Sequence, residues 1–242
     1  MRIALTGLNR HSILKPSSSW LGDIPSHWQA KPVKFVPRIG NGSTPNRDNP
    51  GYWENGSYPW LNSSVVNQNA VTAADEFVTP LALRECHLPK VMPPAVLVGI
   101  TGEGRTRGMA TTLLIEATIN QHLAFVKPNP VQMDVDFLRH VFDVAYLFLR
   151  DESDGGGSTK GAITCRQIAD LKLPVPPLFE QTRIARYLDA QTAIVDVLAA
   201  KVSGAIDKLR EYRTALISAA VTGQIDVRTY RKEPEAILET IA

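Results

Sequence analysis

The sequence lacks the features that mark membrane, secreted and metal-binding proteins. No run approaches 18 apolar residues, and the N-terminus lacks the apolar stretch of a signal peptide. The two cysteines, Cys86 and Cys165, lie far apart and fit no metal-ligand spacing. We therefore expect a soluble, cytoplasmic protein with reduced thiols, no membrane contact and no metal site.

The sequence also lacks an excess of positive or negative charge. The 242 residues carry 26 basic and 24 acidic side chains, which gives a net charge of +2. A protein that binds nucleic acid without sequence preference usually presents a broadly basic surface. Any contact with DNA must therefore come from a local patch. The apolar fraction of 44% is that of an ordinary folded protein, long enough for one substantial domain.

A catalytic arrangement is missing as well. The sequence Asn-Pro-Gly-Tyr at 49–52 resembles the Asn-Pro-Pro-Tyr motif of amino-methyltransferases, but a glycine replaces the second proline. The glycine turn at 101–104 precedes a strand-like run, whereas a nucleotide site needs a helix there. Asp23 with residues 29–31 has no second acid to complete a nuclease magnesium site. We predict no catalytic residue.

What the chain does have is one long helical stretch within Leu173–Arg228. It opens with three prolines, at 174, 176 and 177, which a helix cannot cross. About 44 residues follow with no proline and a single glycine, Gly204. Apolar residues recur at alternating spacings of three and four, which is typical of a coiled coil. The predicted partner-helix residues are Ile184, Leu188, Val195, Leu198, Val202, Ala205, Leu209, Tyr212 and Leu216.

Such a helix spans roughly 65 Å, too far to bury its seam against a domain of this size. We therefore expect the seam to pack against another long helix, and Gly223 to end it. The predicted organisation is a leader (1–19), a folded domain (20–177), the coiled-coil helix (178–227) and a tail (228–242).

The part before the prolines reads as short strands and turns with one helix. Strand-like runs cover Tyr58–Val66, Ala95–Ile100 and Met109–Ile115, and an amphipathic helix covers Asp134–Leu149. Two tryptophans at 20 and 28 predict a clasp that holds the N-terminal segment to the domain. The predicted fold class is an α+β (mixed α/β) domain followed by one long coiled-coil α-helix.

Polar residues gather at the predicted strand ends, where they suit nucleic-acid contacts. Arginines on a glycine-rich turn can reach phosphates or a guanine edge, and amide side chains can read adenine. A Ser-Thr-Lys run after three glycines can cradle a phosphate. The predicted DNA-binding residues are Asn62, Ser63, Ser64, Thr101, Arg105, Arg107, Asn120, Gln121, His122, Ser158, Thr159 and Lys160.

These segments together resemble the specificity subunit of type I restriction–modification systems. The resemblance is strongest in the residues after the prolines and covers nearly the whole chain. It is carried by WLGDIPSHW (20–28), GNGSTPNRDNPGYW (40–53), YPWLNSSVV (58–66), VLVGITGEGRTRG (96–108), INQHLAFVKP (119–128), GSTKGAI (157–163), LPVPPLFEQTRIARYLD (173–189) and ALISAAVTGQIDVR (215–228).

The resemblance implies a non-catalytic reader of double-stranded DNA that selects half of a bipartite site. It also implies a partner modification subunit that binds S-adenosylmethionine and methylates adenine, so that this chain needs no cofactor, and a restriction motor subunit as a further partner. The family's subunits carry two recognition domains and two conserved helices, whereas this chain has one of each.

We therefore expect a homodimer in which the long helices pair antiparallel about a two-fold axis. Pairing with a different half-subunit stays open. Two other functions also stay open: a self-contained adenine methyltransferase with degenerate motifs, and a helical scaffold without DNA specificity.

Overall fold

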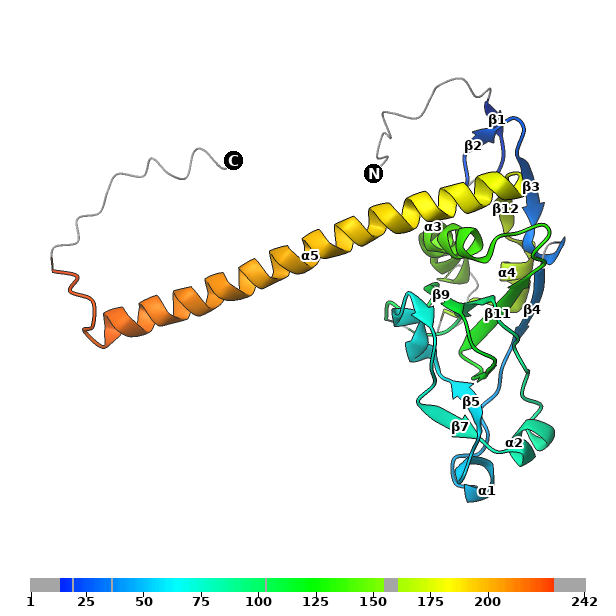
Figure 1. The fold of residues 1–242 in the computed structure, drawn as a ribbon, viewed down its shortest axis with the longest axis horizontal. Helices are drawn as coiled ribbons and strands as arrows, with labels where there is room; N and C mark the ends of the chain where they lie inside the picture. The colour runs from blue at the N-terminus through cyan, green and yellow to red at the C-terminus, as the bar shows by residue number, and fades with distance from the viewer. Residues whose placement is uncertain (1–13, 19, 36, 103, 155–160, 229–242) are drawn as a thin grey trace. The chain divides into compact units, whose positions relative to one another are not determined.

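The computed structural model describes residues 14–18, 20–35, 37–102, 104–154 and 161–228 (Figure 1). Contacts divide the chain into two compact units, Met1–Leu188 and Asp189–Ala242. The first unit mixes strands with short helices, and the long helix α5 (Leu178–Val221) begins in it and forms most of the second. The expected α+β domain followed by one long helix is confirmed.

A five-stranded sheet forms the centre of the first unit. Its order is β4 (Pro37–Asn41), β11 (Leu123–Pro128), β8 (Ala95–Gly99), β9 (Ala110–Leu113) and β6 (Ala70–Val71). The pairs are antiparallel except that of β6 with β9. Every residue of β8 is buried, as its unbroken apolar sequence predicts for a strand covered on both faces.

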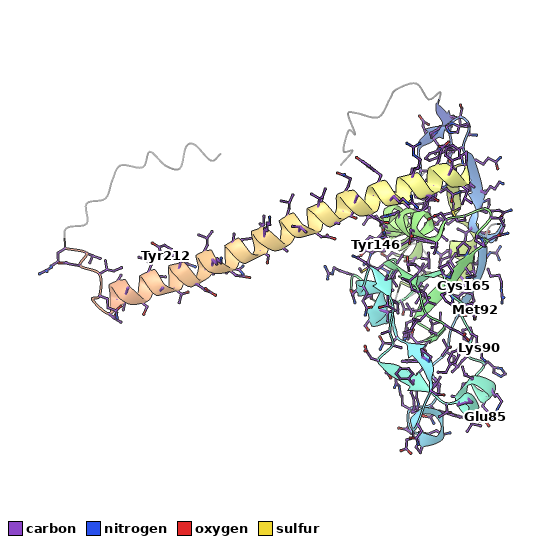
Figure 2. The ribbon with its side chains drawn as sticks, viewed as in Figure 1. Glu85, Lys90, Met92, Tyr146, Cys165 and Tyr212 are labelled. Carbon is purple, nitrogen blue, oxygen red and sulfur yellow. The ribbon has the colours of Figure 1, made fainter. Side chains whose placement is uncertain are left out.

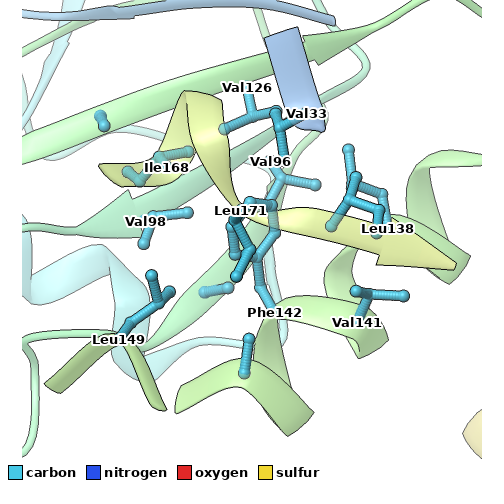
Figure 3. Close-up of a cluster of buried hydrophobic side chains, with 14 of the residues drawn as sticks. Val33, Val96, Val98, Val126, Leu138, Val141, Phe142, Leu149, Ile168 and Leu171 are labelled. Carbon is cyan, nitrogen blue, oxygen red and sulfur yellow. The ribbon is translucent and has the colours of Figure 1, made fainter. Parts of the chain in front are cut away.

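The side chains of β8 belong to two separate hydrophobic clusters, because successive side chains point to opposite sides of a sheet. Val96 and Val98 pack on one side with Phe142 and Leu149 of α3 (Val135–Asp154), as Figure 3 shows. Leu97 packs on the other side in a cluster with, among others, Leu61, Val66, Leu113 and Leu123. Each face of the sheet is therefore covered by its own hydrophobic cluster.

A smaller three-stranded sheet carries part of the second cluster. Its order is β10 (Thr118–Ile119), β5 (Tyr58–Leu61) and β7 (Glu76–Val78). Two short helices, α1 (Pro50–Trp53) and α2 (Pro80–Glu85), pack beside it. Because β5 and β10 run parallel, the residues after both strands leave the sheet at the same end.

The N-terminal segment is tied to the residues that lead into α5. Strand β1 (Leu14–Pro16) pairs with β2 (Asp23–Pro25), and β3 (Gln29–Pro32) pairs with β12 (Lys172–Val175). The Trp20 ring stacks on Phe148 at a centroid distance of 6.0 Å. The expected tryptophan clasp therefore exists, and its Trp20 ring packs on α3.

Several elements differ from the sequence-based expectation of one helix before the prolines, because this part of the chain also forms α1, α2, a further α-helix and two 3-10 helices. The predicted strand at 58–66 ends at Leu61, and a 3-10 helix, η2 (Ser63–Asn67), follows because Asn62 caps it through the Ser64 N–H. A further helix, α4 (Cys165–Asp170), precedes β12 and starts with a capping box between Thr164 and Gln167. Both corrections come from side chains that satisfy the first N–H groups of a turn. A second 3-10 helix, η1 (Val33–Phe35), links β3 to β4.

A fully buried glutamine fastens the start of α5 to the domain. The Gln181 Oε1 atom accepts the Asp134 N–H at 2.9 Å, and Nε2 donates to the carbonyls of Gln132 (3.0 Å) and Pro176 (2.9 Å). Asp134 also caps α3, and its Oδ2 accepts from Thr182 at 2.9 Å. One buried side chain therefore satisfies three backbone groups at the point where α3 and α5 begin.

A second set of contacts joins the same turn to the tryptophan clasp. The Glu180 carboxylate accepts from the Trp28 indole N–H at 2.9 Å and lies 3.0 Å from His27 Nε2. Ala185, one turn later, is buried in the α3 cluster. The first turns of α5 are therefore an integral part of the folded domain.

From Asp189 onward α5 is exposed on all sides over almost all of its length. The apolar residues of the predicted seam lie in water: Val195 is 61% exposed, Val202 59% and Leu209 66%, and Tyr212 stands out from the helix in Figure 2. The helix ends where expected, since Gly223 adopts φ +73° and the Gln224 N–H caps the Ala219 carbonyl. Among the described residues, no helix is long and apolar enough to cross a membrane.

We predict that Gln181→Leu lowers the free energy of unfolding by about 3 kcal/mol, because the buried Pro176 carbonyl and the partly buried Gln132 carbonyl and Asp134 N–H lose their hydrogen-bond partner. Urea unfolding followed by circular dichroism measures the change. Gln224→Leu makes the same chemical change at an exposed position and should alter stability by less than about 0.5 kcal/mol. Equal effects of the two substitutions would contradict the anchoring role of Gln181.

Candidate nucleic-acid interface

Several predicted site residues meet at one edge of the two sheets. Strands β8 and β11 are antiparallel, with Gly99 opposite Leu123, so the loop after β8 and the turn before β11 leave the sheet together. The same turn follows β10, which lies parallel to β5 with Ile119 opposite Leu61. The segments 62–64, 100–102 and 120–122 therefore converge at this edge, although they are far apart in the sequence.

A chain of four polar side chains runs along this edge. The Thr101 Oγ1 atom lies 2.6 Å from His122 Nδ1, and His122 Nε2 lies 3.1 Å from Gln121 Nε2. The Gln121 Oε1 atom lies at hydrogen-bonding distance from the Thr44 hydroxyl. Three of these residues were predicted as DNA contacts, and the structure brings them together. Gln121 is exposed at the edge, and His122 is half-buried behind it.

Thr44 was missed at the sequence level, although its loop was recognised as long and polar. The loop reaches the edge because the Ser43 N–H donates to the Ile119 carbonyl at 3.0 Å. A Cβ atom on Gly42 would lie 1.7 Å from that same carbonyl oxygen, so only glycine allows the approach. Gly42 was therefore the feature of the sequence that could have indicated this approach, but the reason for a glycine there is its contact with Ile119 of β10.

The loop that carries Thr44 is held by an arginine between two tryptophans. The Arg47 guanidinium lies 3.8 Å from the Trp53 ring centroid and 4.7 Å from that of Trp60, and it also pairs with Glu76. Glu76 in turn accepts from the Asn62 amide at 3.2 Å. Cation–π and ion-pair contacts therefore connect the loop to the start of η2.

Asn62 and the two serines after it form the cap of η2. The Asn62 Oδ1 atom accepts the Ser64 N–H at 2.9 Å, which leaves Ser64 exposed and Ser63 half-buried. Asn120 has a comparable structural role, because its buried Oδ1 atom accepts the His122 N–H at 3.0 Å and so shapes the turn. Both asparagines support the edge, and Asn120 presents no amide to solvent.

Arg107 turns inward, contrary to its predicted role. It is only 5% exposed, and its guanidinium donates to both carboxylate oxygens of Asp154, at 2.7 and 3.1 Å, and to Ser153 at 2.9 Å. The hydrogen bond from Arg107 holds the pKa of the Asp154 carboxyl below its usual range. The Arg107 guanidinium, which was expected to reach a phosphate or a guanine, therefore binds Asp154 and Ser153 within the domain.

Arg105 is the arginine of this loop that faces solvent. Its backbone is pinned, because the Tyr146 hydroxyl donates to the Arg105 carbonyl at 3.1 Å and Arg150 donates to the carbonyls of Gly104 (2.8 Å) and Arg107 (3.0 Å). Figure 2 labels Tyr146 on α3 beside this loop. Arg105, Tyr146 and Asn67 help line an open cleft of about 430 Å³.

The remaining predicted residues, Ser158, Thr159 and Lys160, lie outside the described residues. The chain after them returns to the same edge, since Ala162 forms a β-bridge with Thr101 and the Ile163 N–H donates to the Ile100 carbonyl at 2.8 Å. In the described ranges, no group of three His, Cys, Asp or Glu residues is placed to hold a metal ion.

The edge therefore presents amide, imidazole, hydroxyl and guanidinium groups on a rigid frame. These groups donate and accept hydrogen bonds at neutral pH, which suits contacts to base edges and phosphates. The site is therefore suited to recognising a polar partner through hydrogen bonds.

The chain is similar to known proteins in sequence and in fold. Residues 25–203 match the model of the type I restriction modification DNA specificity domain. A relative, the EcoR124I/EcoR124II specificity subunit of Escherichia coli, is 25% identical over 61% of this chain and 37% of its own length.

Two solved structures share the fold. One comes from work on complex assembly and conformational transition of the type I R-M system, with a TM-score of 0.62 and 22% identity over 82% of this chain and 47% of that chain. The other is the HsdS subunit of Thermoanaerobacter tengcongensis, with a TM-score of 0.55 and 22% identity over 73% of this chain and 40% of that one. The chain spans less than half the length of each of these three proteins.

We predict that Arg107→Met lowers the thermal unfolding midpoint by roughly 5 °C at pH 7, because Asp154 and Ser153 lose the guanidinium that joins them to the loop. The decrease in the unfolding midpoint should be at its full size above the ordinary carboxyl pKa of 3.8. It should become smaller as the pH falls through the lowered pKa of Asp154, because protonation of Asp154 breaks the ion pair in the native protein. Calorimetry at several pH values measures it. Arg105→Met, at an exposed position of the same loop, is the control and should leave the midpoint unchanged; equal shifts would contradict the assignment.

Proposed function

Because the chain belongs to the family of type I restriction modification DNA specificity domains, we propose that it recognises DNA sequence for a type I restriction–modification complex. Its recognition domain reads one half of a bipartite site. The observation that carries the proposal is the polar edge, where Thr101, Gln121 and His122 form one hydrogen-bonded chain beside the exposed Arg105.

The exposed seam of α5 is the proposed interface with a second copy of the chain. Leu198, Val202, Leu209 and Leu216 are each between 46% and 66% exposed, which is costly for a row of large apolar side chains in water. A second helix that packs on the seam removes this cost. The length of the seam favours a partner of similar length, and an identical helix supplies one.

The two-fold axis of the proposed pair lies near the middle of the seam, close to Val202 and Ala205. Antiparallel pairing about this axis places the same half-site reader at each end of the pair.

The catalytic work falls to partners in this proposal. A modification subunit docks on the conserved helix, binds S-adenosylmethionine and methylates adenine, while this chain supplies the DNA sequence preference and no cofactor. The same assembly can take a restriction motor subunit, and its place of action is the cytoplasm. The family match over residues 25–203, which includes the first part of α5, supports this division of labour.

We predict that Leu198→Asp with Leu209→Asp converts the dimer into monomers, because each change puts a carboxylate into the apolar seam. Light scattering after size exclusion should give 26.6 kDa for the variant and twice that mass for the wild type. Ala193→Asp with Ala200→Asp adds the same charge on the opposite side of the helix and should leave the dimer intact. A seam variant of unchanged molar mass would rule out this interface.

A methylation map tests the proposed function as a whole. The chain is expressed with its modification subunit, and the DNA of the host is sequenced with detection of modified bases. We expect methyladenine within an interrupted palindrome, because a symmetric dimer reads the same half-site twice. An asymmetric bipartite motif would refute the homodimer but keep the recognition role, and the absence of any motif would refute both.

A further inference from the structure

Gln121 occupies an unusual position at the polar edge, because both ends of its side-chain amide are held while the side chain itself is exposed. One end meets the Thr44 hydroxyl, and the other lies 3.1 Å from His122 Nε2. An exposed glutamine normally samples many rotamers and loses that freedom when it binds. Here the orientation of the amide is set before any ligand arrives.

Within the part of the chain that the structure describes, the two holding contacts leave one donor and one acceptor of the Gln121 amide unused. A glutamine amide has two N–H donors and two lone pairs on its oxygen. If Thr44 donates to Oε1, then Nε2 donates to His122; if the hydroxyl accepts from the amide nitrogen, the oxygen accepts from the imidazole N–H. In either direction one N–H and one lone pair of the amide make no hydrogen bond to the described residues.

A neighbouring donor–acceptor pair on one amide matches a single base in the major groove. Adenine presents the N7 acceptor beside the N6 donor, whereas guanine presents two acceptors, cytosine a donor, and thymine an acceptor with a methyl group. We propose that Gln121 reads one adenine of the half-site in the major groove, and that Thr44 and His122 are the positioning residues that set its amide. This inference rests on the proposed function.

The positioning residues are themselves fixed by the fold. His122 Nδ1 lies 2.6 Å from Thr101 Oγ1, and Thr101 is bridged to Ala162. Thr44 follows the Gly42–Ser43 segment that is hydrogen-bonded to the Ile119 carbonyl. The amide of Gln121 is therefore oriented by the loop that carries Thr44 and, through His122, by the segment that carries Thr101. A pre-oriented contact loses less side-chain entropy on binding and so discriminates more sharply.

Neighbouring amides are less suited to this role. The Asn120 oxygen accepts the His122 N–H inside its own turn, and the residue is 4% exposed. Asn62 caps η2 and donates to Glu76, so its amide serves the frame that holds the Arg47 loop. Of these three amides at the edge, Gln121 is the one that combines exposure with a fixed orientation.

The test is selection of bound duplexes from a randomised DNA library by the full chain, followed by sequencing. We expect the wild type to prefer adenine at one half-site position. Gln121→Ala should reduce that preference by roughly 5- to 150-fold, the range expected for loss of a bidentate contact. Gln121→Glu presents acceptors alone and should move the preference at the same position toward cytosine.

The positioning role has its own variants. Thr44→Val keeps the shape of the side chain and removes the hydroxyl, so adenine should remain preferred but by a several-fold smaller margin, and Thr44→Ser should restore the wild-type margin. A purely structural loss at position 44 would weaken binding to all sequences equally. Gln29→Glu, an exposed change on β3, controls for the added charge and should leave every base preference unchanged.

The outcomes separate this inference from the proposed function. A wild-type preference that survives unchanged in both Gln121 variants would overturn the adenine contact and leave the recognition role standing. A wild type that selects no sequence at all would overturn the recognition role, and the adenine contact with it. Thermal unfolding of each variant shows whether the domain is folded, and the exposed position of Gln121 allows both substitutions without loss of packing.

Discussion

The register of β8 against β11 is the constraint on which the candidate interface depends. Val96 and Val98 must face α3 while Leu97 faces the other cluster, and a shift by one residue would exchange the two sides. That requirement places Gly99 opposite Leu123 and brings the loops around Thr101 and His122 to one edge. The position of the polar groups therefore follows from the packing of apolar ones.

Buried polar side chains hold together segments that the apolar cores do not join. Gln181 and Asp134 link the starts of α3 and α5, and Arg107 ties the loop after β8 to Asp154 at the end of α3. Each of these groups is engaged with backbone or with an opposite charge, as burial requires. The domain therefore holds the recognition loops and the first turns of its long helix by one mechanism, a buried side chain with two or more partners.

The long helix follows a different rule beyond Leu188. Its apolar residues lie in water, and most helical stability in proteins comes from packing an apolar face against another element. The domain core is complete without them, since its buried residues extend along α5 only to Ala185. An exposed apolar seam is the arrangement expected of an assembly surface. The proposed recognition and assembly surfaces therefore lie in different parts of the chain.

The sequence by itself determined the long helix, its end at Gly223 and the α+β class, because proline, glycine and apolar spacing act locally. It also placed Thr101, Gln121 and His122 at strand ends. It could not separate Arg105 from Arg107, since two arginines in one loop look alike until Asp154, 47 residues away, takes one of them inward. The cap that Asn62 forms on η2 is a local contact with Ser64, two residues on. The role of Thr44 was decided by tertiary structure alone, because its partner Gln121 is 77 residues away in the sequence.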